Sequence, residues 1–313
     1  MIMTKVNLII ATYNSEKRLS KTLSSLYDMA QSSHLSNEDW RIILANNKST
    51  DKTAQIAETF VGKLPITIID ANRPGKSAAM NDALKYIDAP LIAFTDDDVE
   101  VCKNWLPLLI QAADTHPDYD MFSGKIVGVW EKELDADLRS WIPVGSTYAL
   151  HETDIDGPCD PGLLWGPNMM FRKSIFDAGH RFNELIGPTP DAFYAMGEDS
   201  EIAKRLSRSG HKSYFCTSAI VNHHIKAETA NENWIIRRAE RLGYGVFAVN
   251  VENYHRRMPN YVPIVVELFI MKLLTICIFP FTSFVSNGRK RFWLKWLYYF
   301  HRGLWKGYKK YAH

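Results

Sequence analysis

Residues 95–98, Thr-Asp-Asp-Asp, are the strongest candidates for chemistry in this 313-residue sequence. They follow the apolar run 91–95, which predicts a strand. Carboxylates two residues apart in an extended segment, here Asp96 and Asp98, point to the same side of the chain. Such a pair can hold a hard divalent cation with open positions, and that cation could bridge a diphosphate. The structural alternative is a solvated acidic turn.

Two further groups of residues carry side chains suited to catalysis or metal binding. Glu198 and Asp199 precede a helical pattern, and a carboxylate there could take a proton from an acceptor hydroxyl. The alternative is that acidic residues simply favour the start of a helix. His223 and His224 follow an apolar run, where a histidine could complete a metal shell or be structural.

Two common nucleotide-binding motifs do not fit this sequence. The run 73–77, Arg-Pro-Gly-Lys-Ser, resembles the end of a P-loop, but that motif requires glycine at the position of Asp70. No GxGxxG run follows a predicted strand, which disfavours a dinucleotide-dependent dehydrogenase. Lys76 could still balance the charge of a phosphate.

The elements that position these residues alternate between predicted strands and helices. Helices are predicted over about fifteen residues from Leu19, with Leu19, Leu23, Leu26 and Tyr27 on one face, and over 52–61 and 77–86. Ser49 or Thr50 could cap the second helix. Strands are predicted at 6–11, 41–45, 66–70 and 91–95. This order predicts an α/β fold with a mostly parallel sheet flanked by helices.

Polar clusters follow three of these strands, at residues 12–14, 46–47 and 96–98. Sheets of this kind bind ligands beyond the carboxyl ends of their strands, so the clusters predict a nucleotide crevice at one sheet edge. Residues 120–225 contain many Gly and Pro residues, and loops of this kind often carry acceptor recognition. Trp130, Trp141 and Trp165 in this region could stack on sugar rings or belong to the local core.

Composition excludes several classes of protein. With 46% hydrophobic and 23% charged residues, the chain is neither disordered nor collagen-like. Four dispersed cysteines without a CxxC pair disfavour a disulfide scaffold or zinc ribbon and favour a reducing compartment. The first residues show no secretory signal, so we expect the cytoplasm.

Residues 255–313 differ in charge from the rest of the chain. They carry eleven Lys or Arg residues and a single acidic residue, Glu267. Interleaved aromatic and basic residues favour a membrane surface, and the apolar stretch 262–286 could span the membrane or lie on it. The alternatives are a basic helix docked on its own domain and, less favoured, a nucleic-acid surface, which nothing in the rest of the chain supports.

Seven motifs occur in order over residues 5–250: IIATYNSEKRL, NNKSTDKT, RPGKSAAMNDAL, FTDDDVE, GPNMMFR, GEDSE and AIVNHH. In order and spacing they are similar to family 2 glycosyltransferases, which have the Rossmann-like nucleotide-diphospho-sugar transferase fold. The resemblance implies an inverting transfer from a nucleotide sugar with a bound Mn²⁺ or Mg²⁺. At the position of Asn46 the family usually carries an aspartate that binds the base, so Asn46 is a departure.

The resemblance also implies roles for individual residues. Asp199 would be the catalytic base, Glu198 would hold the acceptor, and Asn168 and Trp165 would contact the acceptor. Asp98, Asp96 and His223 would bind the metal, with His224 as the alternative histidine. The residues implied in donor binding are Thr12, Tyr13, Asn14, Glu16, Asn46, Lys76, Asn81, Asp96 and Asp97.

The sequence therefore predicts a metal-dependent glycosyltransferase of cell-surface glycan synthesis. A catalytic domain would occupy 1–254, with donor binding in 1–120 and acceptor binding in 121–254, and a membrane-associated helical region would occupy 255–313. The donor would be a UDP-sugar and the acceptor a lipid-linked glycan or polysaccharide, met at the cytoplasmic face of the membrane. The alternatives are a non-catalytic glycan- or lipid-binding protein and a sugar nucleotidyltransferase.

Overall fold

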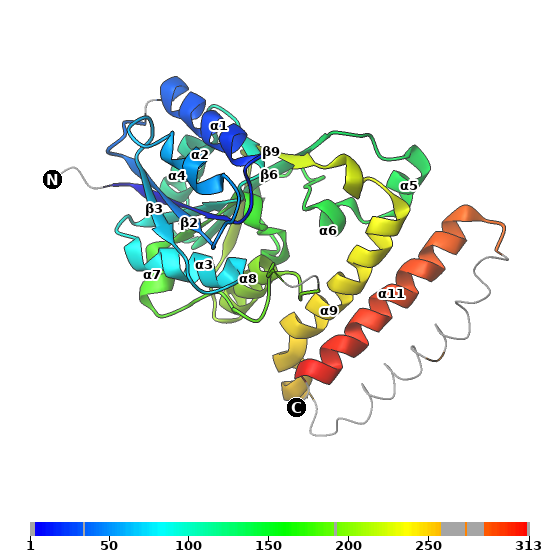
Figure 1. The fold of residues 1–313 in the computed structure, drawn as a ribbon. Helices are drawn as coiled ribbons and strands as arrows, with labels where there is room; N and C mark the ends of the chain where they lie inside the picture. Colours follow the sequence, from blue (N-terminus) through cyan, green and yellow to red (C-terminus); the bar gives the residue numbers. More distant parts are fainter. Residues whose placement is uncertain (1–3, 34, 191–192, 258–272, 274–284, 312–313) are drawn as a thin grey trace. The chain divides into compact units, whose positions relative to one another are not determined.

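The computed structural model describes residues 4–33, 35–190, 193–257, 273 and 285–311 (Figure 1). The chain divides into two compact units. Unit 1 contains residues 1–129, 149–184 and 199–224, and unit 2 contains residues 130–148, 185–198 and 225–313. Unit 1 therefore contains every predicted site residue except Glu198 and the tryptophans Trp130 and Trp141.

Four parallel strands form one half of the sheet in unit 1. Their order is β3 (Ile66–Asp70), β2 (Trp40–Asn46), β1 (Val6–Thr12) and β4 (Leu91–Thr95). The predicted strands agree with these limits to within one residue. All five residues of β4 are buried, as expected for a strand whose side chains are covered on both faces of the sheet.

The other half of the sheet is antiparallel where its pairing is described. The order continues from β4 through β8 (Met169–Arg172), β6 (Met121–Trp130) and β9 (Ser213–Ile225) to β5 (Val99–Val101). β8 runs antiparallel to both β4 and β6, and β9 runs antiparallel to β5 and to the short β7 (Gly157–Pro158). The predicted fold class is confirmed, but the parallel part is limited to four strands.

The helices of unit 1 follow the predicted pattern with local differences. In α1 (Leu19–Ser32) the buried stripe runs through Leu23, Leu26 and Met29, so Tyr27 lies beside it and is 37% exposed. The helix predicted over 52–61 is the shorter α2 (Thr53–Glu58). The predicted caps Ser49 and Thr50 are wrong, because the carboxylate of Asp51 accepts the Thr53 amide instead, at 3.0 Å.

The helix predicted over 77–86 is α3 (Lys76–Ala83), which continues as the 3₁₀ turn η1 (Leu84–Tyr86). It begins after Gly75, whose φ of +107° is a backbone conformation that favours glycine. The remaining helices of unit 1 are α4 (Trp105–Thr115), α7 (Lys173–Asp177) and α8 (Glu198–Arg208), whose first residue belongs to unit 2.

An aromatic cluster in the core fixes β4, the strand that leads to the three aspartates. The ring of Phe94 lies 5.8 Å from Phe171, 6.0 Å from Phe176 and 5.2 Å from Phe182. Edge-to-face pairs of this kind contribute about 0.5–1.5 kcal/mol each beyond burial. The end of β4 is therefore attached to a tightly packed part of the molecule.

Unit 2 is helical in its described part. It contains α5 (Ala136–Trp141), α6 (Val144–Tyr148), η4 (Ala227–Thr229), α9 (Glu232–Arg257) and α11 (Gly288–Tyr311). α11 lies alongside α9 (Figure 1). Glycines allow the close approach, because a Cβ at Gly303 would lie 1.9 Å from the backbone oxygen of Glu240.

Some of the basic residues in 255–313 form ion pairs inside unit 2. Lys295 pairs with Glu232 at 2.8 Å, and Arg302 and Lys306 pair with Glu240 at 3.0 and 2.8 Å. Of the alternatives for residues 255–313, α11 therefore matches the basic helix that is docked on its own domain. Of the stretch 262–286, all but residues 273, 285 and 286 lies outside the described residues. No helix in the described part of the chain has the length and apolar character to cross a membrane.

The two compact units do not coincide with the predicted division at residue 254. Because α11 packs on α9, both helices belong to unit 2. The assignment of donor binding, acceptor binding and membrane contact to parts of the chain remains a prediction.

Candidate active site

The carboxyl ends of β1, β2 and β4 lie side by side, as the polar clusters predicted. Thr12 at the end of β1 pairs in register with Asn46, and Ile10 of β1 pairs with Thr95, the residue before the three aspartates. The loop after β1 is tied to the loop after β2, because the Asn14 side-chain oxygen accepts the Thr50 amide at 2.8 Å. Tyr13, in the loop after β1, is 43% exposed, so its ring is available to a ligand.

Glu16 also connects the loop after β1 to the loop after β2. Its carboxylate accepts the amide of Lys52 at 3.2 Å, while the Glu16 amide donates to Asp51 at 3.1 Å. Glu16 and Asn14 therefore shape the rim of the crevice through bonds to protein.

Asn46, the last residue of β2, and Asn47, the residue after it, have different surroundings. The side-chain oxygen of Asn46 accepts the Ser49 amide at 3.2 Å. The side chain of Asn47 donates to the carbonyls of Ala71 and Arg73, at 2.9 and 2.6 Å, and accepts the Gly75 amide at 2.9 Å. Asn47 thus fixes the loop that leads into α3 and Lys76.

Asp96 and Asp97 have different partners. Asp96 forms an ion pair with Lys76 at 2.5 Å. Asp97 accepts a hydrogen bond from the Thr12 hydroxyl at 2.6 Å and lies 3.9 Å from Arg18. Burial, together with the charge of Asp98, raises the pKa of Asp97 to about 6, against the lowering effect of Thr12 and Arg18.

Asp98 lies between a guanidinium and an imidazole. Its carboxylate is 3.4 Å from Arg18 and 3.7 Å from Nε2 of His223. His224 points to a different carboxylate, that of Glu100, at 2.6 Å. Neighbouring residues of a strand face opposite sides, and β9 therefore presents one histidine to Asp98 and the other to Glu100. Of the two, His223 is the one in position to share an ion with Asp98.

The donor atoms of Asp98 and His223 fit a divalent metal. A carboxylate oxygen and an imidazole nitrogen 3.7 Å apart can bind the same ion, and both atom types are ligands of Mn²⁺ and related metals. Within the described residues no three His, Cys, Asp or Glu side chains form a metal-binding group. An ion held by Asp98 and His223 alone would keep open positions for oxygens of a ligand.

The candidate base Asp199 is held by backbone amides near the Asp96 ion pair. Its carboxylate accepts the Gly166 amide at 2.8 Å and the Ser200 amide at 2.6 Å. A Cβ at Gly166 would lie 2.8 Å from Lys76 Nζ and 3.5 Å from an Asp96 oxygen. The Thr95 hydroxyl donates to Pro167 at 2.7 Å, which ties the same turn to the end of β4. One glycine thus lies between the predicted base and the predicted donor site.

Trp165 and His151 form a stacked pair beside this turn. Their rings are 4.3 Å apart and almost parallel, at 7°. His151 Nδ1 accepts the Ile126 amide and Nε2 contacts the Leu163 carbonyl at 2.8 Å, which defines a neutral ring with its proton on Nε2. Burial lowers the pKa of His151 to about 4. Trp165 is partly exposed and keeps a surface for a ligand.

Two predicted binding residues have their amides engaged by protein. Asn168 is fully buried, accepts the Trp105 indole at 2.8 Å, and donates to the carbonyls of Lys125 and Ala219. Asn81 bonds to the backbone of Phe182 and to Glu184. An acceptor or a diphosphate would have to displace these bonds, so the structure favours a positioning role for both residues.

Three predicted residues lie in unit 2. Trp130 packs on Tyr148 at 4.8 Å, and Trp141 lies 6.0 Å from Phe292, which is local core packing. Glu198 is buried, and its charge opposes the lowering of the Arg238 pKa that burial causes.

Sequence reasoning missed the residues that act across long separations in the chain. Arg18 contacts Asp98 although it lies 80 residues before it in the chain. The sequence indicates Asn47 only as part of a polar turn, and it gives no indication of His151. Gly166 was recognised only as part of a motif. A lone glycine or arginine has no spacing signal, so only the fold reveals these contacts.

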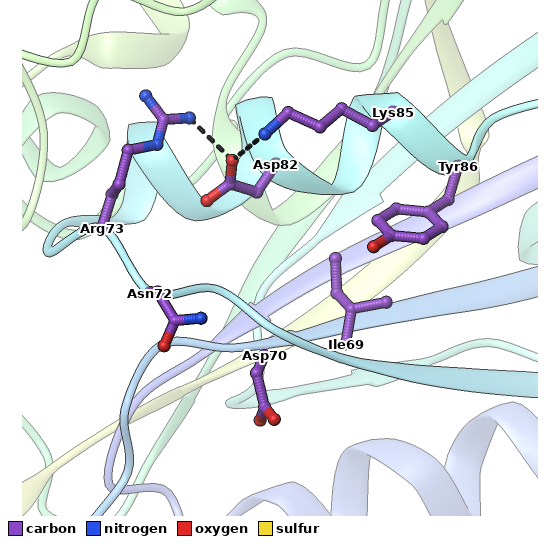
Figure 2. Close-up of a pocket in the computed structure, with 7 residues that line it drawn as sticks. All are labelled: Ile69, Asp70, Asn72, Arg73, Asp82, Lys85 and Tyr86. Carbon is purple, nitrogen blue, oxygen red and sulfur yellow. Dashed lines mark hydrogen bonds and ion pairs between the residues drawn. The ribbon is translucent and has the colours of Figure 1, made fainter.

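A separate hollow of about 280 Å³ lies at the edge strand β3 (Figure 2). Figure 2 shows Arg73 and Lys85 both directed at Asp82, at 2.8 and 2.6 Å. Burial opposes ionisation of Asp82, but these two cations lower its pKa. The lining residues are Ile69, Asp70, Asn72, Arg73, Asp82, Lys85 and Tyr86.

The fold is that of the nucleotide-sugar transferases. The crystal structure of Staphylococcus aureus TarS residues 1–349 with UDP-GlcNAc has a TM-score of 0.56 at 16% identity, covering 98% of this chain and 92% of that one. A mannosyltransferase from Pyrobaculum calidifontis, solved with GDP-Man and Mn²⁺, has a TM-score of 0.62 at 16% identity, covering 98% and 88%.

The chain belongs to glycosyl transferase family 2, whose sequence model matches residues 7–179. It is 30% identical over 256 residues to the poly(ribitol-phosphate) beta-N-acetylglucosaminyltransferase TarS of Staphylococcus aureus. It is 32% identical over 221 residues to a poly(ribitol-phosphate) beta-glucosyltransferase of Bacillus spizizenii. These matches cover 81% and 67% of this chain but 42% and 32% of the relatives' lengths.

Proposed function

We propose that this glycosyltransferase moves a sugar, with inversion, from a UDP-sugar to a hydroxyl of a polyol-phosphate polymer in cell-wall glycan synthesis. The observation that carries the proposal is the Gly166 turn, which bonds Asp199 and touches the Lys76–Asp96 pair. A base for an acceptor and charged groups for a diphosphate are thereby neighbours. The names of the relatives support the acceptor class, and the TarS complex supports the UDP-sugar.

The proposed chemistry assigns the proton and the leaving group. The Asp199 carboxylate takes the proton of the acceptor hydroxyl, and the oxygen forms a bond to the anomeric carbon. The bond from that carbon to the diphosphate breaks on the opposite side, so the configuration inverts and UDP leaves. Lys76 and Arg18 are cations positioned to balance phosphate charge, although both now contact aspartates.

Asp98 and His223 would hold the Mn²⁺ or Mg²⁺ that the family implies, with Asp96 as a further carboxylate nearby. A divalent cation bound there would stabilise the negative charge that builds up on the diphosphate. Tyr13, exposed at the crevice rim, would stack on the base, and Asn46 would be its polar neighbour.

Asp199→Asn tests the proposed base. The single amide oxygen can still accept the Gly166 amide, and only the bond from the Ser200 amide is lost, so we expect an intact fold. The turnover number for sugar transfer should fall about 10²–10⁴-fold, while the Kd for UDP changes less than about twofold. Glu201→Gln removes the same charge from the same helix and serves as the matched control. Near-normal turnover in Asp199→Asn would contradict the assignment, and loss of UDP binding would make Asp199 a donor ligand.

The first turn of α11 supports a second proposal, contact with an anionic membrane surface at the cytoplasmic face. Arg289, Lys290 and Arg291 are exposed and have no ion pair within the described residues. Cations at a helix N-terminus oppose the macrodipole, so their presence there has a cost that lipid phosphate would offset. A vesicle-binding measurement tests this proposal.

A further inference from the structure

Two arginines of α9 lie in an aromatic cluster within unit 2. The guanidinium of Arg238 lies over the ring of Trp234 at 5.2 Å, and that ring stacks on Tyr148 at 5.4 Å and 8°. Arg241, one helical turn further on, lies over the ring of Tyr194 and donates to its hydroxyl at 3.2 Å. Aromatic rings therefore fix both guanidinium groups.

Arg238 lacks the partner that a buried guanidinium requires. Its Nε atom is buried and has no hydrogen-bond acceptor, and no ion pair joins Arg238 to any residue that the structure describes. Burial, and the nearby charge of Arg241, lower the pKa of Arg238 to about 10. A buried donor without an acceptor is destabilising, so a ligand oxygen that accepts a hydrogen bond from Nε would stabilise this site.

The charges around Arg238 favour an anion. The groups that act on it are Arg241, Tyr194, Tyr148 and Glu198. Glu198 is the single carboxylate among these four, so two guanidinium groups face one acidic side chain. The hydroxyl of Tyr148 already donates to the Thr229 carbonyl at 2.9 Å. A planar guanidinium with an unpartnered Nε–H group beside a stacked aromatic pair suits a phosphate oxygen.

We propose that Arg238, assisted by Arg241, binds a phosphodiester group of the acceptor polymer. This inference rests on the proposed transfer to a polyol-phosphate acceptor. The acceptor is favoured over the donor diphosphate because Glu198 of this cluster directly precedes Asp199, the proposed base, in the chain. The donor candidates Lys76, Asp96 and Asp98 belong to other segments and have partners of their own.

Arg238→Gln in the full chain tests the assignment by steady-state kinetics with a synthetic ribitol-phosphate oligomer. We expect the KM for the oligomer to rise at least about tenfold, as for the loss of a charged hydrogen bond, while the KM for the UDP-sugar stays within about twofold. The matched control is Arg237→Gln, which removes the same charge from the exposed neighbouring position. A rise in the KM for the UDP-sugar instead would assign Arg238 to the donor and overturn the proposal.

A second measurement does not depend on turnover. In protein labelled with ¹⁵N-arginine, the Nε signals of Arg238 and Arg237 are assigned by their absence from the spectra of Arg238→Lys and Arg237→Lys. Inorganic phosphate should shift the Arg238 signal and leave the Arg237 signal unchanged. No shift at 50 mM phosphate (on the order of the weakest relevant affinity), together with an unchanged KM for the oligomer, would overturn the proposal. If phosphate shifts the signal but the wild type transfers no sugar to the oligomer, the proposed function fails and the anion site stands.

A purely structural role for Arg238 makes a different prediction. If the arginine only orients Glu198, Arg238→Gln should lower kcat without raising the KM for the oligomer, and phosphate should not shift its Nε signal. That pattern would reject the binding role. Arg241→Gln, which leaves Arg238 and Trp234 in place, gives a second variant should Arg238→Gln fail to fold.

Discussion

His151 is a residue whose protonation the fold opposes. Its Nδ1 accepts a backbone amide, so a proton there would break that bond while the ring is buried against Trp165. The folded pKa of about 4 lies below the value of 6.5 for an unperturbed histidine. Between these values the unfolded chain binds a proton that the folded protein does not, so the free energy of unfolding falls as the pH drops from about 6.5 to 4.

We therefore expect His151→Gln to remove part of this pH dependence. Urea unfolding between pH 7 and pH 4.5 should show a loss in the wild type that exceeds the loss in the variant by about 2 kcal/mol. Between pH 7 and 8 the histidine is largely neutral in both the folded and the unfolded state. The free energy of unfolding should therefore change by the same amount in the wild type and in His151→Gln. Identical slopes below pH 6.5 would mean that His151 is not buried as a neutral ring.

Individual residues also mark the limit of sequence reasoning. Asp96, Asp98, Asp199 and His223 were selected by residue type and motif, and the fold brings each of them close to another charged or polar group. Asn81 and Asn168 were selected by the same resemblance, but their amides bond to backbone carbonyls far away in the chain. An asparagine that binds substrate and one that braces a loop have the same sequence signal, because both are polar residues next to apolar runs.

At the scale of elements, the parallel strands could be predicted and the antiparallel ones could not. Buried parallel strands are short apolar runs, and β1 to β4 were each found to within one residue. β8 and β9 contain alternating or mixed residues and pair with strands tens of residues away, so the loop-rich reading of 120–225 missed them. The helix predicted over 52–61 is too long mainly at its C-terminal end, because α2 ends at Glu58 and the chain then turns through Gly62, whose φ is +83°.

The turn at Gly166 is the element that connects the two halves of the candidate site. Its amide bonds Asp199, its neighbour Pro167 accepts the Thr95 hydroxyl, and a side chain at its position would meet Lys76. This geometry explains why a glycine stands between Trp165 and Pro167. It depends on three segments that the sequence does not show to be neighbours.

For the molecule as a whole, the positive charges of residues 285–311 fall into two groups. Lys295, Arg302 and Lys306 pair with carboxylates of α9, whereas the cations of the first turn of α11 are exposed. We expect the variant with glutamine at 289, 290 and 291 to bind vesicles of phosphatidylglycerol at least about tenfold more weakly than the wild type, since each cation near such a surface contributes about 1 kcal/mol.

The matched control is glutamine at Lys17, Lys21 and Lys63, which are exposed lysines of unit 1. Salt should weaken vesicle binding of the wild type and of this control alike. Equal binding by the α11 variant and the wild type would reject the first turn of α11 as the contact, whatever the salt concentration.

We propose that Asp98 and His223 together form a metal-dependent nucleotide site in this glycosyltransferase. Calorimetric titration of the full chain with UDP, with and without Mn²⁺, tests it most directly, using Asp98→Ala and, as matched control, Glu100→Gln. The account predicts that Mn²⁺ tightens UDP binding at least about tenfold in the wild type and in Glu100→Gln, and has no such effect in folded Asp98→Ala. UDP binding that ignores Mn²⁺, or that survives unchanged in Asp98→Ala, would contradict it.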